Sequence, residues 1–161
     1  RALATAIRIA GGADYAPRLN ALEAVYAALL AGQLGGGRTL AGVKIARKGG
    51  RIIFTREVAG ARKAASLILA PGQEGLWDGR FHIRLLKAAR RARIEVRALA
   101  QEGLAALHAR EVRLPPVPSA ILQALPGLWK DGECVAAPHF ETDILGFEWD
   151  VMLRRALPIK V

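Results

Sequence analysis

Apolar and polar residues alternate along much of this chain with a period of two, which predicts short strands joined by tight turns. The clearest case is Arg38–Glu57, where two runs rich in β-branched residues, 43–46 and 52–55, flank Gly49 and Gly50. Paired glycines adopt the positive φ angles that a two-residue hairpin turn requires. We therefore predict a β-hairpin in this stretch.

Further alternating segments predict more strands. Asp78-Gly79 precedes Phe81–Leu85, in which Phe81, Ile83 and Leu85 form one apolar face and His82 and Arg84 a polar one. A second Asp-Gly pair, at 131–132, predicts another hairpin. The remaining strands are expected at 67–70, at 94–97, on both sides of the 131–132 turn, and within Phe140–Val161, where Glu141, Asp143, Glu148 and Asp150 alternate loosely with apolar residues.

Helical spacing is clearest near the N-terminus. Residues 1–10 predict a helix that ends at Gly11-Gly12. Asp14 is expected to cap the next helix, with Pro17 in its first turn. One apolar stripe on that helix would consist of Leu19, Leu22, Tyr26, Leu29 and Leu30. A shorter helix is expected at 102–109. Another is expected to begin at Ser119, which would cap it, and to end before Pro126.

The stretch Gly32–Gly37 suggests a linker between two regions. It contains four glycines, which favour a flexible connection. A phosphate-binding loop is disfavoured, because no GK[ST] follows it and the next predicted element is a strand. The predicted organisation is a helical remnant at 1–33 and a C-terminal α+β domain at 34–161. The fold class is therefore α+β, with a hairpin-rich antiparallel sheet and a few short helices.

Composition limits the class of protein. Apolar residues make up 52% of the 161 residues, which is enough for a packed core, and no apolar run approaches the roughly 18 residues of a membrane span. The single cysteine, Cys134, excludes an internal disulfide and fits a cytoplasmic location. The chain begins with Arg1 inside a helical pattern and has one methionine, Met152. We expect it to be the C-terminal piece of a longer protein.

The charge is uneven. The net charge is +10, and residues 38–97 hold 15 Lys or Arg and four acidic residues. A basic block of this kind is typical of proteins that bind a phosphate backbone. The candidate RNA-binding residues, all basic and most of them on predicted hairpins, are Arg38, Lys44, Arg47, Lys48, Arg51, Arg56, Arg80, Arg84, Arg90, Arg91 and Arg93.

Aromatic residues near the turns allow two interpretations. Trp77, Phe81 and Trp129 could stack on bases. Aromatic residues beside hairpin turns more often pack in the core or across strands, so core packing is the favoured interpretation.

The residues suggest no catalytic or metal site. His82, His108 and His139 lie far apart in the sequence, and none is at metal-ligand spacing from another His or Cys. Cys134 has no motif around it and is expected to be a buried structural thiol. The paired acids of the last segment are expected on the solvated face of a strand.

Four segments together resemble the C-terminal part of bacterial tRNA(Ile)-lysidine synthetases. They are GGADYAPRLNALEAVYAALLAG, RTLAGVKIARKGGRIIFTRE, LAPGQEGLWDGRF and LPGLWKDGECVAAPHF, and they span most of residues 11–140. Their order and spacing carry the resemblance, and the segment after Phe140 matches least.

The resemblance implies a function. Enzymes of this family are ATP-dependent ligases that attach lysine to the wobble cytidine of tRNA(Ile), using ATP and Mg in an N-terminal domain with an SGGxDS loop. This chain lacks that loop, so it is expected to be non-catalytic alone and to hold no cofactor. Its implied role is to hold the tRNA beside its own N-terminal catalytic domain, with a homodimer also possible.

Two other functions are open. The basic region could be a structural or protein-interaction domain that docks on an acidic partner or on its own N-terminal domain. An independent small-molecule enzyme would require convergent polar groups in a pocket, and the sequence suggests no such set.

Overall fold

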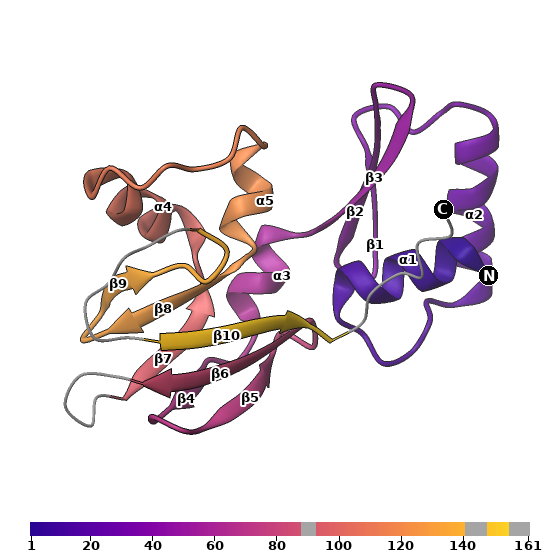
Figure 1. The fold of residues 1–161 in the computed structure, drawn as a ribbon. Coiled ribbons are helices and arrows are strands. Elements are labelled where there is room, and N and C mark those ends of the chain that lie inside the picture. The colour runs from indigo at the N-terminus through magenta and orange to yellow at the C-terminus, as the bar shows by residue number, and fades with distance from the viewer. Residues whose placement is uncertain (88–92, 141–147, 155–161) are drawn as a thin grey trace, which may run out of the picture. The chain divides into compact units, whose positions relative to one another are not determined.

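The structure is a computed structural model that describes residues 1–87, 93–140 and 148–154 (Figure 1). Within these residues the chain forms five helices and ten strands, and every strand pair is antiparallel. The predicted α+β class, rich in hairpins, is therefore confirmed. None of the described helices is long and apolar enough to cross a membrane.

The chain divides into two compact units, with the limit between Glu57 and Val58. The first contains residues 1–57, and the second Val58–Arg154. The limit predicted from the glycine-rich segment, between residues 33 and 34, falls inside the first unit. The reason is that the basic hairpin and the two N-terminal helices share one buried cluster.

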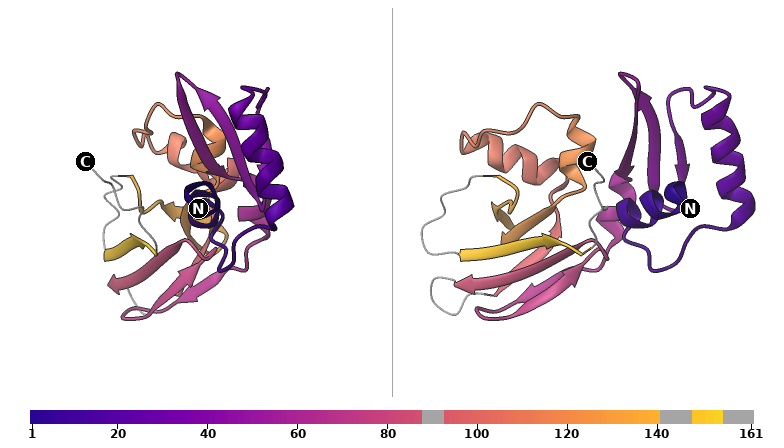
Figure 2. Two further views of the ribbon diagram at one scale, coloured as in Figure 1. Left: turned by 90° about the vertical axis from the view of Figure 1, so that its right-hand side faces the viewer. Right: turned by 45° about the vertical axis from the view of Figure 1, so that its right-hand side comes forward.

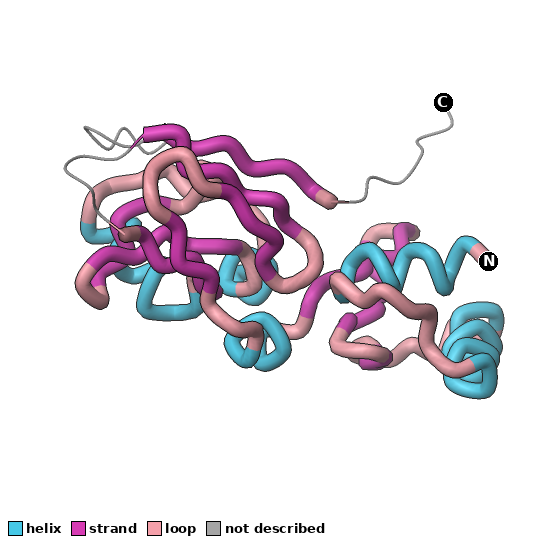
Figure 3. The backbone as a smooth tube through the Cα atoms, turned by 90° about the horizontal axis from the view of Figure 1, so that it is seen from below, coloured by secondary structure: helices cyan, strands magenta, loops and turns pink. Residues whose placement is uncertain are grey.

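The first unit combines two helices with a three-stranded sheet. Its elements are α1 (Ala2–Gly11), α2 (Leu19–Leu30), β1 (Arg38–Leu40), β2 (Val43–Lys48) and β3 (Arg51–Arg56), and the strand order is β1-β2-β3. The predicted hairpin is confirmed: Lys48 pairs with Arg51 across Gly49 and Gly50, whose φ angles are 56° and 75°. Strand β1 was not predicted. Figures 2 and 3 show α1 starting at the end marked N, and α1 lies against β3.

The helices of this unit differ from the sequence prediction in two respects. Helix α1 ends as predicted, at a left-handed Gly12, but α2 begins only at Leu19, and Asp14 does not cap it. Of the predicted stripe only Leu29 is buried, while Leu19 and Leu30 are 70% and 73% exposed. The buried face instead contains Val25, Ala28 and Leu29. Nearly every residue of α2 is apolar, so spacing alone does not indicate which side packs.

The glycine-rich segment is held in place rather than free. Leu34 is 4% exposed and belongs to the same cluster as Ile7, Val43 and Ile45. The Gly37 amide donates to the Leu34 carbonyl over 2.8 Å, which closes a turn. The prediction of a flexible linker here is therefore wrong, because one apolar side chain anchors the segment in the core.

The second unit contains the remaining elements. They are α3 (Val58–Lys63), β4 (Leu67–Leu69), β5 (Glu74–Trp77), β6 (Phe81–Lys87), β7 (Ile94–Ala98), α4 (Ala100–Ala109), α5 (Ser119–Gln123), β8 (Pro126–Lys130), β9 (Glu133–Ala136) and β10 (Glu148–Leu153). The strands form two sheets, one with the order β10-β6-β5 and one with the order β4-β7-β8-β9.

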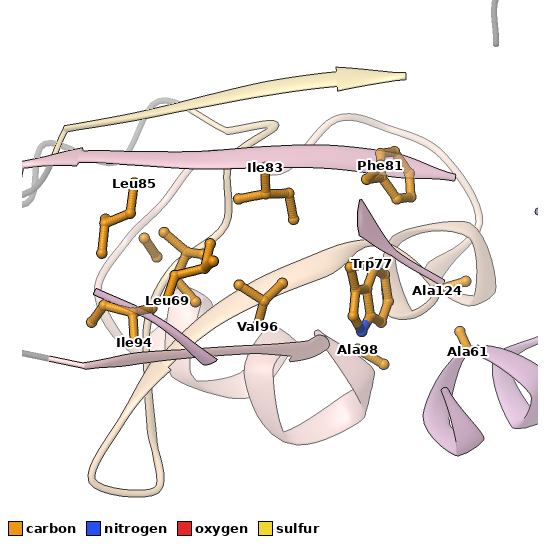
Figure 4. Close-up of a cluster of buried hydrophobic side chains, with 12 residues drawn as sticks. Ala61, Leu69, Trp77, Phe81, Ile83, Leu85, Ile94, Val96, Ala98 and Ala124 are labelled. Atoms are coloured by element: carbon orange, nitrogen blue, oxygen red, sulfur yellow. The ribbon is translucent and has the colours of Figure 1, made fainter. Parts of the chain in front are cut away.

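These two sheets face each other through one apolar cluster. Phe81, Ile83 and Leu85 extend from β6 toward Ile94 and Val96 on β7, as Figure 4 shows. All five residues are 3% exposed or less. The strict alternation along β6 and β7 produces this layer, because every second side chain points to the same face.

Helices cover the other face of the four-stranded sheet (Figure 1). Leu104 and Leu107 of α4 and Leu122 of α5 form a second cluster with Trp129 and Cys134 of β8 and β9. The unit therefore has three layers: a three-stranded sheet, a four-stranded sheet and a helical layer.

Most of the local predictions for this unit are confirmed. The structure contains both Asp-Gly hairpins, the strands at 67–70 and 94–97 and the final strand. The turn of the first Asp-Gly hairpin has three residues, because Trp77 pairs with Phe81. Residues 58–63 form helix α3, and Ser119 begins α5 without the predicted side-chain cap. Trp77, Phe81, Trp129 and Cys134 are all buried, as expected. Glu141 and Asp143 lie outside the described residues, while Glu148 and Asp150 are exposed on β10.

Candidate nucleic-acid interface

The β1–β3 sheet has two chemically different faces. Val43 and Ile45 point toward the helices and are completely buried. Because side chains alternate along a strand, Lys44 and Lys48 point the opposite way, and Arg51 shares their face as the partner of Lys48. All three cations are exposed. We call this outer surface of the sheet the basic face; its residues are Thr39, Lys44, Ala46, Lys48, Arg51, Ile53 and Thr55.

None of the seven members of the basic face is acidic, and the Glu57 carboxylate directly after β3 accepts a hydrogen bond from Thr39 at its edge, over 3.3 Å. Lys48 and Arg51 are directly opposite each other across the hairpin. Like charges in cross-strand positions destabilise a sheet by a few tenths of a kcal/mol up to about 1 kcal/mol. A polyanion lying on this face would remove that repulsion.

The position of Lys44 depends on a neighbouring glycine. A Cβ atom at Gly37 would lie 2.9 Å from Cε of Lys44, and Gly37 has a φ of 111°. The positive φ therefore favours glycine, and a side chain here would also displace the flexible end of Lys44. The glycine-rich segment contributes to the shape of the basic face in this way.

The other candidate cations of the hairpin lie on the helix-facing side. Arg47 Nη2 donates to the Leu29 carbonyl at the C-terminus of α2, over 3.4 Å. A cation there offsets the partial negative charge of the helix end. Arg56 Nη1 donates to the Gly42 carbonyl over 3.2 Å, in the turn between β1 and β2. Arg38 shares their face, because it pairs with Ile45, and Arg38 and Arg47 are both exposed.

Arg80 is a correction to the candidate set. Its side chain is 8% exposed, its Nε lies 2.7 Å from the Asp78 carboxylate, and its Nη2 donates to the Ala124 carbonyl. Its Cζ also lies 4.7 Å from the centre of the Phe81 ring. A cation held by these partners is not available to a ligand on the surface. Its role is to join the turn between β5 and β6 to the segment that follows α5.

Arg84 is exposed but flanked by acids on both sides. On the outer surface of its sheet it pairs in register with Glu74 of β5 and with Asp150 of β10. The Arg84 Nε lies 2.7 Å from the Glu74 carboxylate, and this hydrogen bond and charge attraction lower the pKa of Glu74. The surface around Arg84 is therefore close to neutral.

The remaining candidates are less informative. Arg93 is exposed just before β7, and Arg90 and Arg91 lie outside the described residues. Residues 1–57 contain nine Lys or Arg and three acidic residues, whereas 58–154 contain 13 and 11. The concentration of unopposed positive charge is thus in the first unit. Counting strand positions outward from Val43 would have separated the two faces from the sequence alone.

The polar groups that could suggest chemistry do not converge. Within the described residues, no group of three or more His, Cys, Asp or Glu is placed to hold a metal ion. The His139 ring lies against Phe81, 5.2 Å between centres. Its partial burial there lowers the pKa of His139, and nearby Arg80 adds to the effect. Burial raises the pKa of the Cys134 thiol to about 11.

Comparison of the chain with protein-family models, with curated protein sequences and with solved structures gave no significant match.

Proposed function

We propose that this chain binds the phosphate backbone of a folded RNA through the basic face of the β1–β3 sheet. The observation that supports this most directly is that Lys44, Lys48 and Arg51 lie on one sheet surface, and that Glu57, the acid that the described residues place against it, is hydrogen-bonded to Thr39. Exposed cations of this kind neutralise phosphates and release counterions, which gives affinity without reading the base sequence.

The spacing of these cations suits an extended polyanion. Lys44 and Lys48 are four residues apart on one strand, roughly 13 Å at the usual rise per residue. They would therefore contact separate phosphates rather than one. Arg51 adds a third contact beside Lys48. The hydroxyls of Thr39 and Thr55 donate within the sheet, to the Glu57 carboxylate and to the Lys44 carbonyl, so the three cations carry the proposed contacts.

We further propose that the RNA is tRNA(Ile) and that the chain is the C-terminal part of a tRNA(Ile)-lysidine synthetase. This rests on the four sequence segments described above. In this proposal the chain is not catalytic by itself: it helps to hold the tRNA while an N-terminal domain uses ATP and Mg to ligate lysine to the wobble cytidine. Its own N-terminal domain is then a second partner.

The test compares two variants with the same change in net charge. Lys44→Glu/Lys48→Glu/Arg51→Glu reverses the basic face. Arg18→Glu/Lys63→Glu/Arg113→Glu reverses three exposed cations elsewhere. Binding of labelled tRNA(Ile) is measured by fluorescence anisotropy over a series of KCl concentrations. We expect the first variant to bind much more weakly and to lose about three from the slope of log Kd against log salt, one for each phosphate contact.

The control variant is expected to keep most of the slope. Equal losses in both variants would mean that only net charge matters, and an unchanged slope in the first would exclude the basic face. Binding of an acidic protein but of no RNA would favour the alternative of a protein-docking domain. Circular dichroism of each variant verifies that it is folded.

A further inference from the structure

A cavity of about 420 Å³ lies in the second unit, where α4 covers strands β7–β9. Its lining residues all belong to the second unit, whereas the basic face belongs to the first. The lining residues that the argument uses are Arg97, Glu102, Arg110, Trp129 and Glu133. Its volume is sufficient for a nucleobase or a compound of similar size.

The cavity contains a stacked pair. Cζ of Arg97 lies 3.8 Å from the centre of the Trp129 ring. The indole is 3% exposed, whereas the Arg97 side chain remains 36% exposed. One face of the guanidinium is therefore covered by Trp129, and part of the side chain remains accessible in the cavity that Arg97 lines.

One donor of Arg97 has no hydrogen-bond partner among the described residues. Its Nε is buried without a hydrogen-bond partner, and the nearest carboxylate oxygen, of Glu95, is 3.7 Å away. Arg80 and Arg84, in contrast, donate to Asp78 and Glu74 over 2.7 Å. A buried donor without a partner costs free energy. The guanidinium is therefore held over the indole, with a 3.7 Å ion pair to Glu95 that does not satisfy the Nε donor.

We propose that this cavity binds one unpaired nucleobase, which stacks on the guanidinium of Arg97. Flat arginine side chains supported by an aromatic ring are platforms for unstacked bases. Glu102 and Glu133 on the walls accept hydrogen bonds from the exocyclic amino group of adenine, cytosine or guanine. The same two carboxylates oppose a bare phosphate. This inference rests on the proposed RNA-binding function and adds a base-binding subsite to it.

The experiment uses two RNA hairpins that differ in one group. One contains a single bulged adenosine, and the other has an abasic site at the same position. Stacking of one base contributes about 1–3 kcal/mol, so the wild type should bind the bulged hairpin roughly tenfold more tightly. Arg97→Lys keeps the charge but loses the planar guanidinium. It should reduce the ratio of the affinities for the bulged and the abasic hairpin to near one. Arg113→Lys, at an exposed site, should leave the ratio unchanged.

Several outcomes would overturn the proposal. They are a wild-type ratio near one, a ratio that persists in Arg97→Lys, or a ratio that millimolar inorganic phosphate abolishes. The basic-face variant Lys44→Glu/Lys48→Glu/Arg51→Glu separates the two proposals, because it should weaken both hairpins equally and keep the ratio. If this variant binds both hairpins as tightly as the wild type and keeps the affinity ratio, the basic face is rejected and the base-binding cavity is retained.

A second measurement does not depend on hairpin affinity. Adenosine monophosphate is added to the wild-type protein, and the indole N–H resonance of Trp129 is followed by NMR. We expect a saturable shift in the wild type that is absent in Arg97→Lys. No shift in the wild type at millimolar nucleotide would also overturn the proposal.

Discussion

Arginine accounts for 18 of the 24 basic residues, and its neighbours decide what each one does. Arg80 is buried with a carboxylate and a carbonyl, and Arg47 contacts the end of a helix. Arg84 lies between two acids, and Arg97 lies flat on an indole. The planar guanidinium has five donors and suits all four environments. At the residue scale, the positive charge of Arg47, Arg80 and Arg84 predicted contacts with a ligand, whereas these side chains make contacts within the protein.

The buried thiol leads to a prediction about pH. Burial raises the pKa of Cys134 from 9.0 to about 11, against a smaller opposite effect of Arg110 and Arg97. The folded state therefore loses this proton at higher pH than the unfolded state does. The contribution of this proton to the free energy of unfolding is fully present below pH 9 and is lost as the pH rises toward 11.

Urea unfolding of the wild type and of Cys134→Ala at pH 8 and about pH 10.5 measures this effect. The wild type should lose about 2 kcal/mol more than Cys134→Ala between the two pH values. Equal losses would contradict the prediction, since the alanine variant keeps every other titrating group. Iodoacetamide should also react slowly with the native thiol at pH 8.

At the element scale, strand alternation determines which chemistry each surface carries. In β2 it directs Val43 and Ile45 inward and Lys44 and Lys48 outward. In β7 it places Ile94 and Val96 in one layer and Arg97 beneath α4, because neighbouring side chains point to opposite faces.

Close packing of α4 on the sheet leads to a prediction about Gly103. A Cβ atom there would lie 2.7 Å from Cδ1 of Leu99 and 3.2 Å from Cζ2 of Trp129. Alanine normally stabilises a helix interior by about 1 kcal/mol relative to glycine. Here we expect the opposite, a loss of about 1–3 kcal/mol from overpacking.

Thermal or urea unfolding of Gly103→Ala tests this expectation. Gly36→Ala is the control, because no atom lies within 4 Å of the added carbon and its φ is not positive. That variant should change stability by less than about 0.5 kcal/mol. A stabilised Gly103→Ala would show that α4 can shift to make room.

At the scale of the whole molecule, each compact unit contains its own buried cluster. The aromatic residues divide in the same way: both tyrosines, Tyr15 and Tyr26, are in the first unit, and all three tryptophans are in the second. Tryptophan emission therefore reports on the second unit alone.

We predict that the two units lose stability separately. Ile45→Ala removes a completely buried side chain from the first unit and should cost it about 2–5 kcal/mol. Hydrogen exchange of residues 1–57 should then accelerate, while the urea midpoint followed by tryptophan emission stays the same.

Ile94→Ala is the matched control in the second unit, where the side chain is also completely buried. It should lower the tryptophan midpoint and leave the exchange of residues 1–57 unchanged. If Ile45→Ala lowers the tryptophan midpoint as much as Ile94→Ala does, the units unfold together and the prediction is wrong.

What could be read from the sequence was local. Glycine and Asp-Gly pairs predicted the three hairpins, because positive φ angles favour those residues, and period-two alternation predicted most strands. The burial of Cys134, Trp77, Phe81 and Trp129 was also predicted from the sequence. The sequence also located an excess of basic residues at 38–97.

The tertiary structure decided what depends on partners distant in the chain. Leu34 anchors a segment that looks like a linker, and the packed side of α2 is chosen by the sheet it meets. The acids around Arg84 come from β5 and β10, more than 70 residues apart in sequence. Long-range contacts of this kind leave no periodic signal. For that reason charge could be counted from the sequence, while the distinction between free and committed cations required the fold.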